Sequence, residues 1–249
     1  MATEVVLGEV TCPSGQLVIM DGGYVELWSG DQVPDDEENP ATDFAIEGAD
    51  AEAAAASFDR QTGTRLYDIP VHAVADLTDV FDEHCREHGL DAWLRAFERQ
   101  VPHRERVRHA VAARESGFGV TGVPVLSMEA PAGRALRVTA VPGKHGWQSM
   151  RIELGDAPVA DSWEFGELGV DHARLVFADA DALGSWEHTG PLDGLVLSGR
   201  DHEAGVIEIG GASVLMAMTS VGDGFFLVHL DVDADGIPVA LRIDLAGEH

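Results

Sequence analysis

The pentapeptide Leu17-Val18-Ile19-Met20-Asp21 recurs in the second half of the chain as Leu175-Val176-Phe177-Ala178-Asp179, and this repeated stretch decides the fold. The match runs without a gap from residues 8–28 to residues 166–186, at a constant shift of 158 positions (8 to 166). Six residues are identical across it, whereas unrelated stretches of this length share about one or two. Such a repeat indicates an architecture built from related units.

A second match follows between residues 46–53 and 197–204, at a shift of 151 positions (48 to 199). The first copy therefore carries seven more residues in the intervening loop, which contains the acidic run Asp35-Asp36-Glu37-Glu38. No counterpart of the closing hairpin of the second copy is recognisable in the first. We therefore expect a full unit, a partial copy of it, and a segment between them.

Short apolar runs bounded by turn residues predict strands over most of the chain. Val5-Val6-Leu7 and residues 16–20, separated by Pro13-Ser14-Gly15, have the pattern of a hairpin. Beyond residue 119 further strands are expected, and no helix. They cover residues 123–128, 135–141, 150–154, 206–209 and 214–218, and a closing hairpin of 226–232 and 239–245 turning at Asp233-Ala234-Asp235-Gly236.

The hydrophobic period becomes helical between these β regions. Residues 77–88 predict an amphipathic helix, capped by Asp76 or Thr78 and ended by Gly89. A second helix is expected from Asp91 to the residue before Pro102, and a third from Pro102 toward Glu115. This segment is rich in arginine, which indicates either a solvated face paired with acidic residues of the same chain or a docking surface for an anion. Its arginines are Arg86, Arg95, Arg99, Arg104, Arg106, Arg108 and Arg114.

The predicted fold is mainly β (α+β), a β-rich sandwich or barrel-like unit with a partial repeat of itself and a short helical insert. The expected ranges are 1–75 for the partial β repeat unit, 76–118 for the helical insert and 119–249 for the full β-rich unit. A hydrophobic content of 45% is enough for a packed core.

The charge balance narrows the function classes. The chain has 44 acidic against 16 basic residues, a formal net charge of −28. Such a field repels phosphate backbones and anionic membrane surfaces, so no nucleic acid and no membrane partner is expected. A basic protein or a small-molecule ligand remains as a partner, and the oligomeric state is left open. No apolar run reaches the ~20 residues of a membrane span, and neither a leader nor a disulfide framework is recognisable, which predicts a cytoplasmic protein.

Candidate catalytic residues come from carboxylates and histidines of the second copy. Asp179 ends the repeated strand, Asp223 lies between two glycines, and His172 and His202 lie near acidic residues; together they would suit acid–base or metal-assisted hydrolysis. The alternative interpretation makes each Asp a turn former that bonds nearby backbone amides. No phosphate-binding loop, nucleophile elbow or dinucleotide fingerprint is found, so no cofactor is expected.

Two further motifs suggest metal binding. His84 and His88 lie one helical turn apart with Cys85 beside His84, but a zinc site needs three or four protein ligands and no further pair has a matching spacing. The stretch D-x-D-x-D-G at residues 231–236 resembles part of a calcium loop, yet strands flank it and Arg242 occupies the position of the bidentate Glu. A hairpin turn explains the same residues.

Several short motifs occur in the C-terminal half in a fixed order. They are Pro131-Ala132-Gly133-Arg134, Arg151-Ile152-Glu153-Leu154-Gly155-Asp156, Val170-Asp171 with Leu175 and Asp179 after it, Gly222-Asp223-Gly224-Phe225-Phe226, Asp235-Gly236 and Leu241-Arg242-Ile243-Asp244-Leu245. In this order residues 122–245 resemble a family of uncharacterised bacterial proteins grouped as a domain of unknown function. Ala173 and Ala180 depart from the Gly and Pro usual there. The resemblance implies a β-rich fold and a bacterial origin, and no activity.

The expected function is therefore a non-catalytic binding or interaction module. The alternatives are a metal-assisted hydrolase using His172, Asp179, His202 and Asp223, and an acidic immunity-type inhibitor of a cationic toxin. Convergence of the four hydrolase candidates in one pocket would favour the enzyme.

Overall fold

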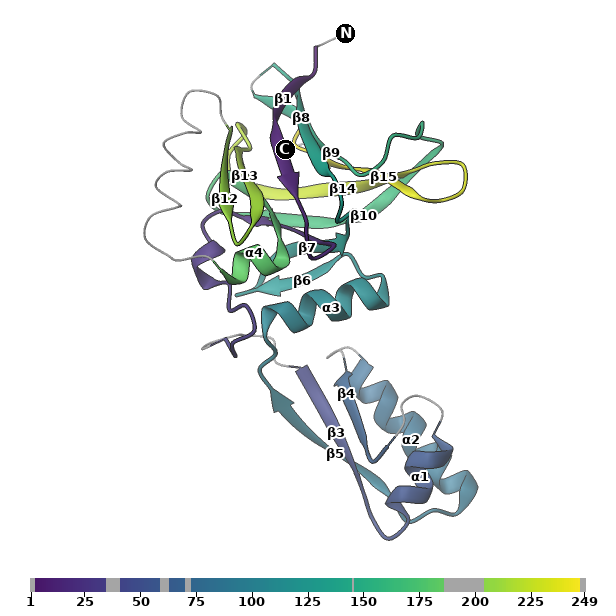
Figure 1. The fold of residues 1–249 in the computed structure, drawn as a ribbon. Coiled ribbons are helices and arrows are strands. Elements are labelled where there is room, and N and C mark those ends of the chain that lie inside the picture. The colour runs from purple at the N-terminus through teal and green to yellow at the C-terminus, as the bar shows by residue number, and fades with distance from the viewer. Residues whose placement is uncertain are drawn as a thin grey trace. The chain divides into compact units, whose positions relative to one another are not determined.

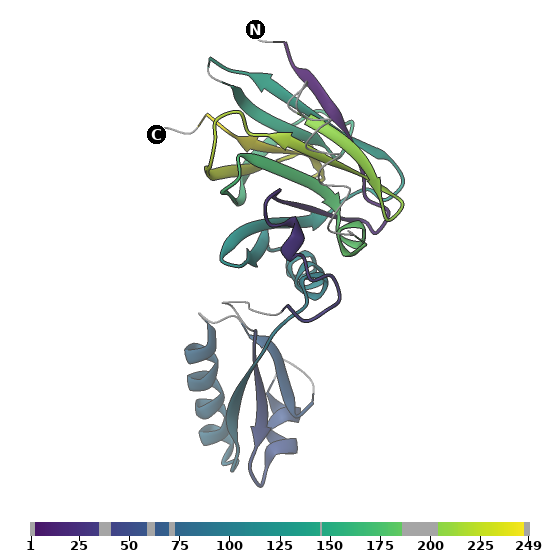
Figure 2. The same cartoon turned by 90° about the vertical axis from the view of Figure 1, so that its left-hand side faces the viewer.

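The computed structural model describes residues 3–34, 41–58, 63–69, 73–144, 146–185 and 204–246. The protein is mainly β, with 48% strand against 20% helix, which confirms the predicted α+β class. It divides into two compact units, one formed by residues 1–35 and 102–249 and the other by residues 36–101 (Figures 1 and 2). Among the described helices, none has the length and apolar character needed to cross a membrane.

The inserted unit differs from the helical insert expected at residues 76–118. It spans residues 36–101 and has a sheet and a core of its own. Its elements in chain order are β3 (Ala41–Glu47), α1 (Ala51–Ser57), β4 (Arg65–Ile69), α2 (Val74–His88) and β5 (Trp93–Arg99). The strands pair antiparallel in the order β4-β3-β5, and Phe44, Leu66 and Phe81 are among the buried residues of this unit.

The helix expected from Asp91 is wrong, because residues 93–99 form strand β5. All seven of its residues pair with β3, from Trp93 opposite Glu47 to Arg99 opposite Ala41. Leu94 is half-buried against the core of this unit, while its neighbours Trp93 and Arg95 are exposed. Pairing with a strand 46 to 58 residues earlier in the chain (Glu47 with Trp93, Ala41 with Arg99) thus outweighs a weak local preference for helix.

Helix α2 ends as predicted and begins differently. Gly89 adopts the left-handed conformation at its C-terminal end, with φ of 65°. The N-cap is Ala73, which offers no side-chain hydrogen bond, and both Asp76 and Thr78 lie inside the helix. Thr78 donates its hydroxyl to the carbonyl of Val74 at 3.0 Å, so neither expected cap acts as one.

The larger unit contains two six-stranded antiparallel sheets that are not closed into a barrel. Sheet A has the order β1 (Val5–Thr11), β8 (Ala135–Pro142), β9 (Trp147–Glu153), β15 (Pro238–Asp244), β14 (Gly224–Val232) and β10 (Asp161–Val170). Sheet B has the order β12 (Ala204–Ile209), β13 (Ala212–Met218), β11 (Arg174–Asp179), β2 (Gln16–Asp21), β7 (Val123–Glu129) and β6 (Gly117–Val120).

Alternating side chains of the two sheets form the main core between them. Leu17, Ile19 and Phe177 of sheet B are buried there with residues such as Ile152 and Phe226 of sheet A. The other face of sheet B is covered by η1 (Val25–Leu27), α3 (His103–Ala113) and α4 (Ala180–Gly184), which enclose a second core (Figure 1). The third predicted helix is thus confirmed as α3, and the predicted closing hairpin as β14–β15.

Two expectations for this unit are wrong. Residues 5–11 and 16–21 do not form a hairpin, because β1 pairs with β8 in sheet A while β2 pairs with β7 and β11 in sheet B. The turn at residues 13–15 therefore crosses from one sheet to the other. The short helix α4 was also not expected; Asp179 caps it by accepting from two of its backbone amides.

The two repeated strands pair with each other. In the antiparallel pair β2–β11, Ile19 lies opposite Phe177, and these are the residues that the sequence match aligns. Leu17 likewise lies opposite Asp179, and Asp21 opposite Leu175. A pairing in which equivalent residues meet at the centre has local twofold symmetry.

Sheet A has the same symmetry. At its centre, Arg151 of β9 lies opposite Arg242 of β15. At its two edges the register shifts between Val6 and Gly8 in β1, and between Glu164 and Gly166 in β10, which are again matched positions. Strands β8 and β9 hold the places in the first half that β14 and β15 hold in the second. The correspondence thus extends to the closing hairpin, which the sequence comparison had placed in the second copy alone.

Candidate functional site

The repeated Asp21 is buried and bonded to backbone amides. One carboxylate oxygen accepts from Gly23 N at 2.5 Å, and the other from Asp171 N and from His172 N at 2.9 Å. The His172 ring lies beside it, with Nδ1 at 3.1 Å from Oδ1. Asp21 therefore closes its own turn and holds the turn between β10 and β11.

Asp179 makes the matching contacts in the other half. Its Oδ1 accepts from Asp181 N at 2.8 Å and Ala182 N at 3.1 Å, while its Oδ2 accepts from Ser14 N at 2.7 Å. Ser14 is the sequence counterpart of His172, so each carboxylate holds the turn of the opposite half. These contacts agree with the turn-forming interpretation of both residues.

The candidate hydrolytic residues are placed apart where they are described. His172 contacts Asp21, and Asp21 and Asp179 lie at opposite ends of the β2–β11 ladder, four residues or about 13 Å apart. Asp223 is exposed in the connection between β13 and β14, and His202 lies outside the described residues. His172 and Asp179 therefore share no site.

The candidate metal ligands His84 and His88 do lie together on α2. Their ring centroids are 4.3 Å apart, His84 Nε2 lies 2.8 Å from Ser57 Oγ, and His88 Nδ1 lies 2.9 Å from the His84 carbonyl oxygen. Within the described part of the chain, no group of three or more His, Cys, Asp or Glu residues is arranged to hold a metal ion. In the 231–236 turn, Asp233 Oδ1 accepts from Asp235 N and Ile237 N, both at 2.9 Å, which is the bonding of a hairpin turn.

Four arginines of the arginine-rich segment pair with acidic residues of the same chain. The pairs are Arg95 with Glu47, Arg99 with Asp43, Arg104 with Asp181, and Arg108 with Asp31. Arg104 is nearly buried and also donates to Gln16 Oε1 at 2.8 Å. Each of these four pairs lies within a single unit, Arg95 and Arg99 in the inserted unit and Arg104 and Arg108 in the larger one.

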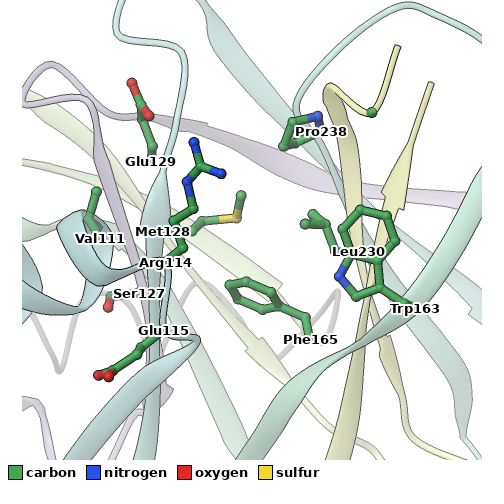
Figure 3. A pocket seen from close by; sticks show the side chains of 11 residues that line it. Val111, Arg114, Glu115, Ser127, Met128, Glu129, Trp163, Phe165, Leu230 and Pro238 are labelled. Atoms are coloured by element: carbon green, nitrogen blue, oxygen red, sulfur yellow. The ribbon is translucent and has the colours of Figure 1, made fainter. Parts of the chain in front are cut away.

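A cavity of about 420 Å³ opens at one end of the β-sandwich, and we call it the Trp163 cavity. Its volume is within the range of small-molecule sites, about 300–1,000 Å³. It is formed by the end of α3, strands β7 and β10, and the β14–β15 turn, all within the larger unit. Its lining comprises Val111, Arg114, Glu115, Ser127, Met128, Glu129, Trp163, Phe165, Leu230, Gly236 and Pro238 (Figure 3).

The Trp163 cavity has two unlike walls. In Figure 3 the charged side chains, Arg114, Glu115 and Glu129, stand on one side. Phe165, Trp163, Leu230 and Pro238 stand on the other. Such a lining suits a ligand with an apolar body and a polar group.

Ser127 belongs to this lining, and its hydroxyl is buried from solvent. The residue is 1% exposed, and among the described residues its Oγ has no hydrogen-bond partner. A buried hydroxyl without a partner costs about 1–3 kcal/mol. Ser127 pairs with Val18 of β2, and at the matched place in the other half Val176 of β11 pairs with Met216. A polar side chain thus replaces a buried apolar one at the cavity.

The sheet A side of the Trp163 cavity also differs from the matched place in the other half. Trp163 and Phe165 correspond, at the shift of 158 positions, to the smaller Val5 and Leu7. In sheet B, the first residue of β6, Gly117, lies opposite Leu126, and Val206 of β12 lies opposite Leu215 at the matched place. Strand β12 has two further residues before Val206, whereas β6 has none before Gly117. These departures from symmetry all lie at the Trp163 cavity.

Sequence reasoning missed this cavity. Trp163 and Phe165 belong to a strand, whereas Arg114 and Ser127 belong to other elements. The only signal of these residues in the sequence is that they differ from their matched residues in the other half. This signal can be seen only when the two halves are matched over their full length.

The comparisons with known proteins add no relative: no family model, no curated protein and no solved structure matches the chain.

Proposed function

We propose that this protein is a non-catalytic binding module that holds a small molecule in the Trp163 cavity. The observation that supports this most is the asymmetry of an otherwise twofold fold. Where one half has Val5, Leu7 and Met216, the other has a cavity lined by Trp163, Phe165 and Ser127, and the buried Ser127 hydroxyl has no hydrogen-bond partner among the described residues. A polar group kept buried at a cost in stability is typical of a functional site.

The hydrolase alternative has less support. Its members His172 and Asp179 each serve a different turn, and the Asp179 carboxylate is occupied by backbone amides. A general base must reach the proton that it abstracts, and Asp179 accepts three hydrogen bonds already.

Titration with N-phenyl-1-naphthylamine, a neutral dye that brightens in apolar sites, tests the proposal. We expect saturable binding to the wild-type protein and at least about tenfold weaker binding to Trp163→Ala, because the indole forms much of the apolar wall. Trp93→Ala is the matched control, since Trp93 is 49% exposed against 45% for Trp163 and lies on the inserted unit. Equal binding by Trp163→Ala and wild type would contradict the proposal.

A further inference from the structure

We infer that the ligand of the Trp163 cavity is a small organic cation with an apolar body, an inference that rests on the proposed binding function. The charged wall has two carboxylates, Glu115 and Glu129, against one guanidinium, that of Arg114. The formal charge of the lining is therefore −1, in a chain of formal charge −28. Both fields attract a cation and repel an anion.

The end of helix α3 acts in the same direction. Val111, Arg114 and Glu115 lie at its C-terminal end, and they line the cavity. Arg114 ends the helix in the left-handed conformation, with φ of 58°. The C-terminal end of a helix carries the equivalent of about half a negative charge, which favours a nearby cation.

The apolar wall supplies aromatic faces for the same charge. Trp163 is 45% exposed and Phe165 is half-buried, and both face the cavity (Figure 3). A cation above an aromatic ring is attracted by the ring quadrupole, and tryptophan gives the strongest interaction. An aliphatic or aromatic body on the cation would cover Leu230 and Pro238.

Arg114 lowers the negative charge of the wall without reversing it. It stands on the same side of the cavity as both carboxylates (Figure 3). A carboxylate ligand bonded to Arg114 would therefore approach two like charges and one opposite charge, whereas an ammonium group would meet two opposite charges and one like charge. The geometry thus favours the cation.

The test compares two probes of similar size and opposite charge, benzyltrimethylammonium and phenylacetate. Each is titrated into the full-length protein, with tryptophan fluorescence and isothermal calorimetry as readouts. We expect benzyltrimethylammonium to bind at least about tenfold more tightly. The double variant E115Q/E129Q should reduce this preference to about twofold or less.

The control for the overall field is E9Q/E26Q, which removes the same two charges at exposed positions outside the cavity lining. It should keep the preference of the wild type. A preference equally reduced by both double variants would overturn the inference, because the whole-chain field would then explain it. Tighter or equal binding of phenylacetate would also overturn it, while N-phenyl-1-naphthylamine binding that depends on Trp163 would leave the proposed function standing. If neither benzyltrimethylammonium nor phenylacetate binds, the inference is overturned. If the wild-type protein also fails to bind N-phenyl-1-naphthylamine, the inference and the proposed function are both refuted.

Discussion

Replacing Asp179 by alanine tests whether the repeated carboxylates are structural. Asp179 is 2% exposed and accepts hydrogen bonds from Ser14 N, Asp181 N and Ala182 N. Hydrogen bonds to a charged group contribute about 1.5–3 kcal/mol each, and loss of a helix cap alone costs about 1 kcal/mol. Because the three bonds share one side chain and are not additive, we expect a loss of about 3–5 kcal/mol of unfolding free energy.

Urea denaturation, followed by far-ultraviolet circular dichroism and by tryptophan fluorescence, measures this loss. Asp223→Ala is the matched control, because Asp223 is exposed and the chemical change is the same. It should alter the unfolding free energy by no more than about 0.5 kcal/mol. Asp21→Ala should behave like Asp179→Ala, since Asp21 makes the equivalent contacts.

The sign of the effect decides between two roles for Asp179. A residue held in an active site is often unfavourable for stability, so its removal leaves the stability unchanged or raises it. A loss below about 1 kcal/mol, or any gain, would refute the structural interpretation of both carboxylates.

Three further outcomes follow from the packing. Gly8→Ala should lower the unfolding free energy by about 1–3 kcal/mol in urea denaturation, because the added Cβ would lie 2.6 Å from Leu215 Cδ1. Gly133→Ala is its control: the added Cβ would have nothing within 4 Å, so this variant should be neutral or slightly stabilising. Burial raises the pKa of the Cys12 thiol to about 12. Since only the thiolate reacts, alkylation of Cys12 by iodoacetamide at pH 8 should be at least about 100-fold slower in the folded protein than in urea, and should rise with pH toward the folded pKa, as measured by mass spectrometry. Ser127→Ala should raise the unfolding free energy of the ligand-free protein by about 1 kcal/mol, and a loss would show that its hydroxyl has a partner.

Much of the local structure could be predicted from the sequence. Alternating apolar residues located the strands of the second half and the turn at Asp233, and Gly89 marked the end of α2. These signals are local: a left-handed cap or a hairpin turn involves neighbouring residues, and the residue types that allow it are few.

Which strands pair with each other could not be predicted in the same way. Strand β5 takes its conformation from pairing with β3, and β1 and β2 separate into different sheets although only a short turn joins them. The exposed Trp163 and the buried Ser127 have no shared local pattern, so the cavity between their elements was invisible in the sequence.

The repeated strand thus shows what the sequence determines and what the tertiary structure determines. The sequence by itself determined that residues 17–21 and 175–179 are matched strands ending in an aspartate, because a short apolar run and the turn chemistry after it are properties of adjacent residues. Only the tertiary structure decided that the two strands pair with each other, that each aspartate holds the turn of the opposite half, and that one side of the sandwich stays open at Trp163. Those outcomes depend on contacts between segments about 150 residues apart, and these contacts are chosen by the free energy of burying whole surfaces together.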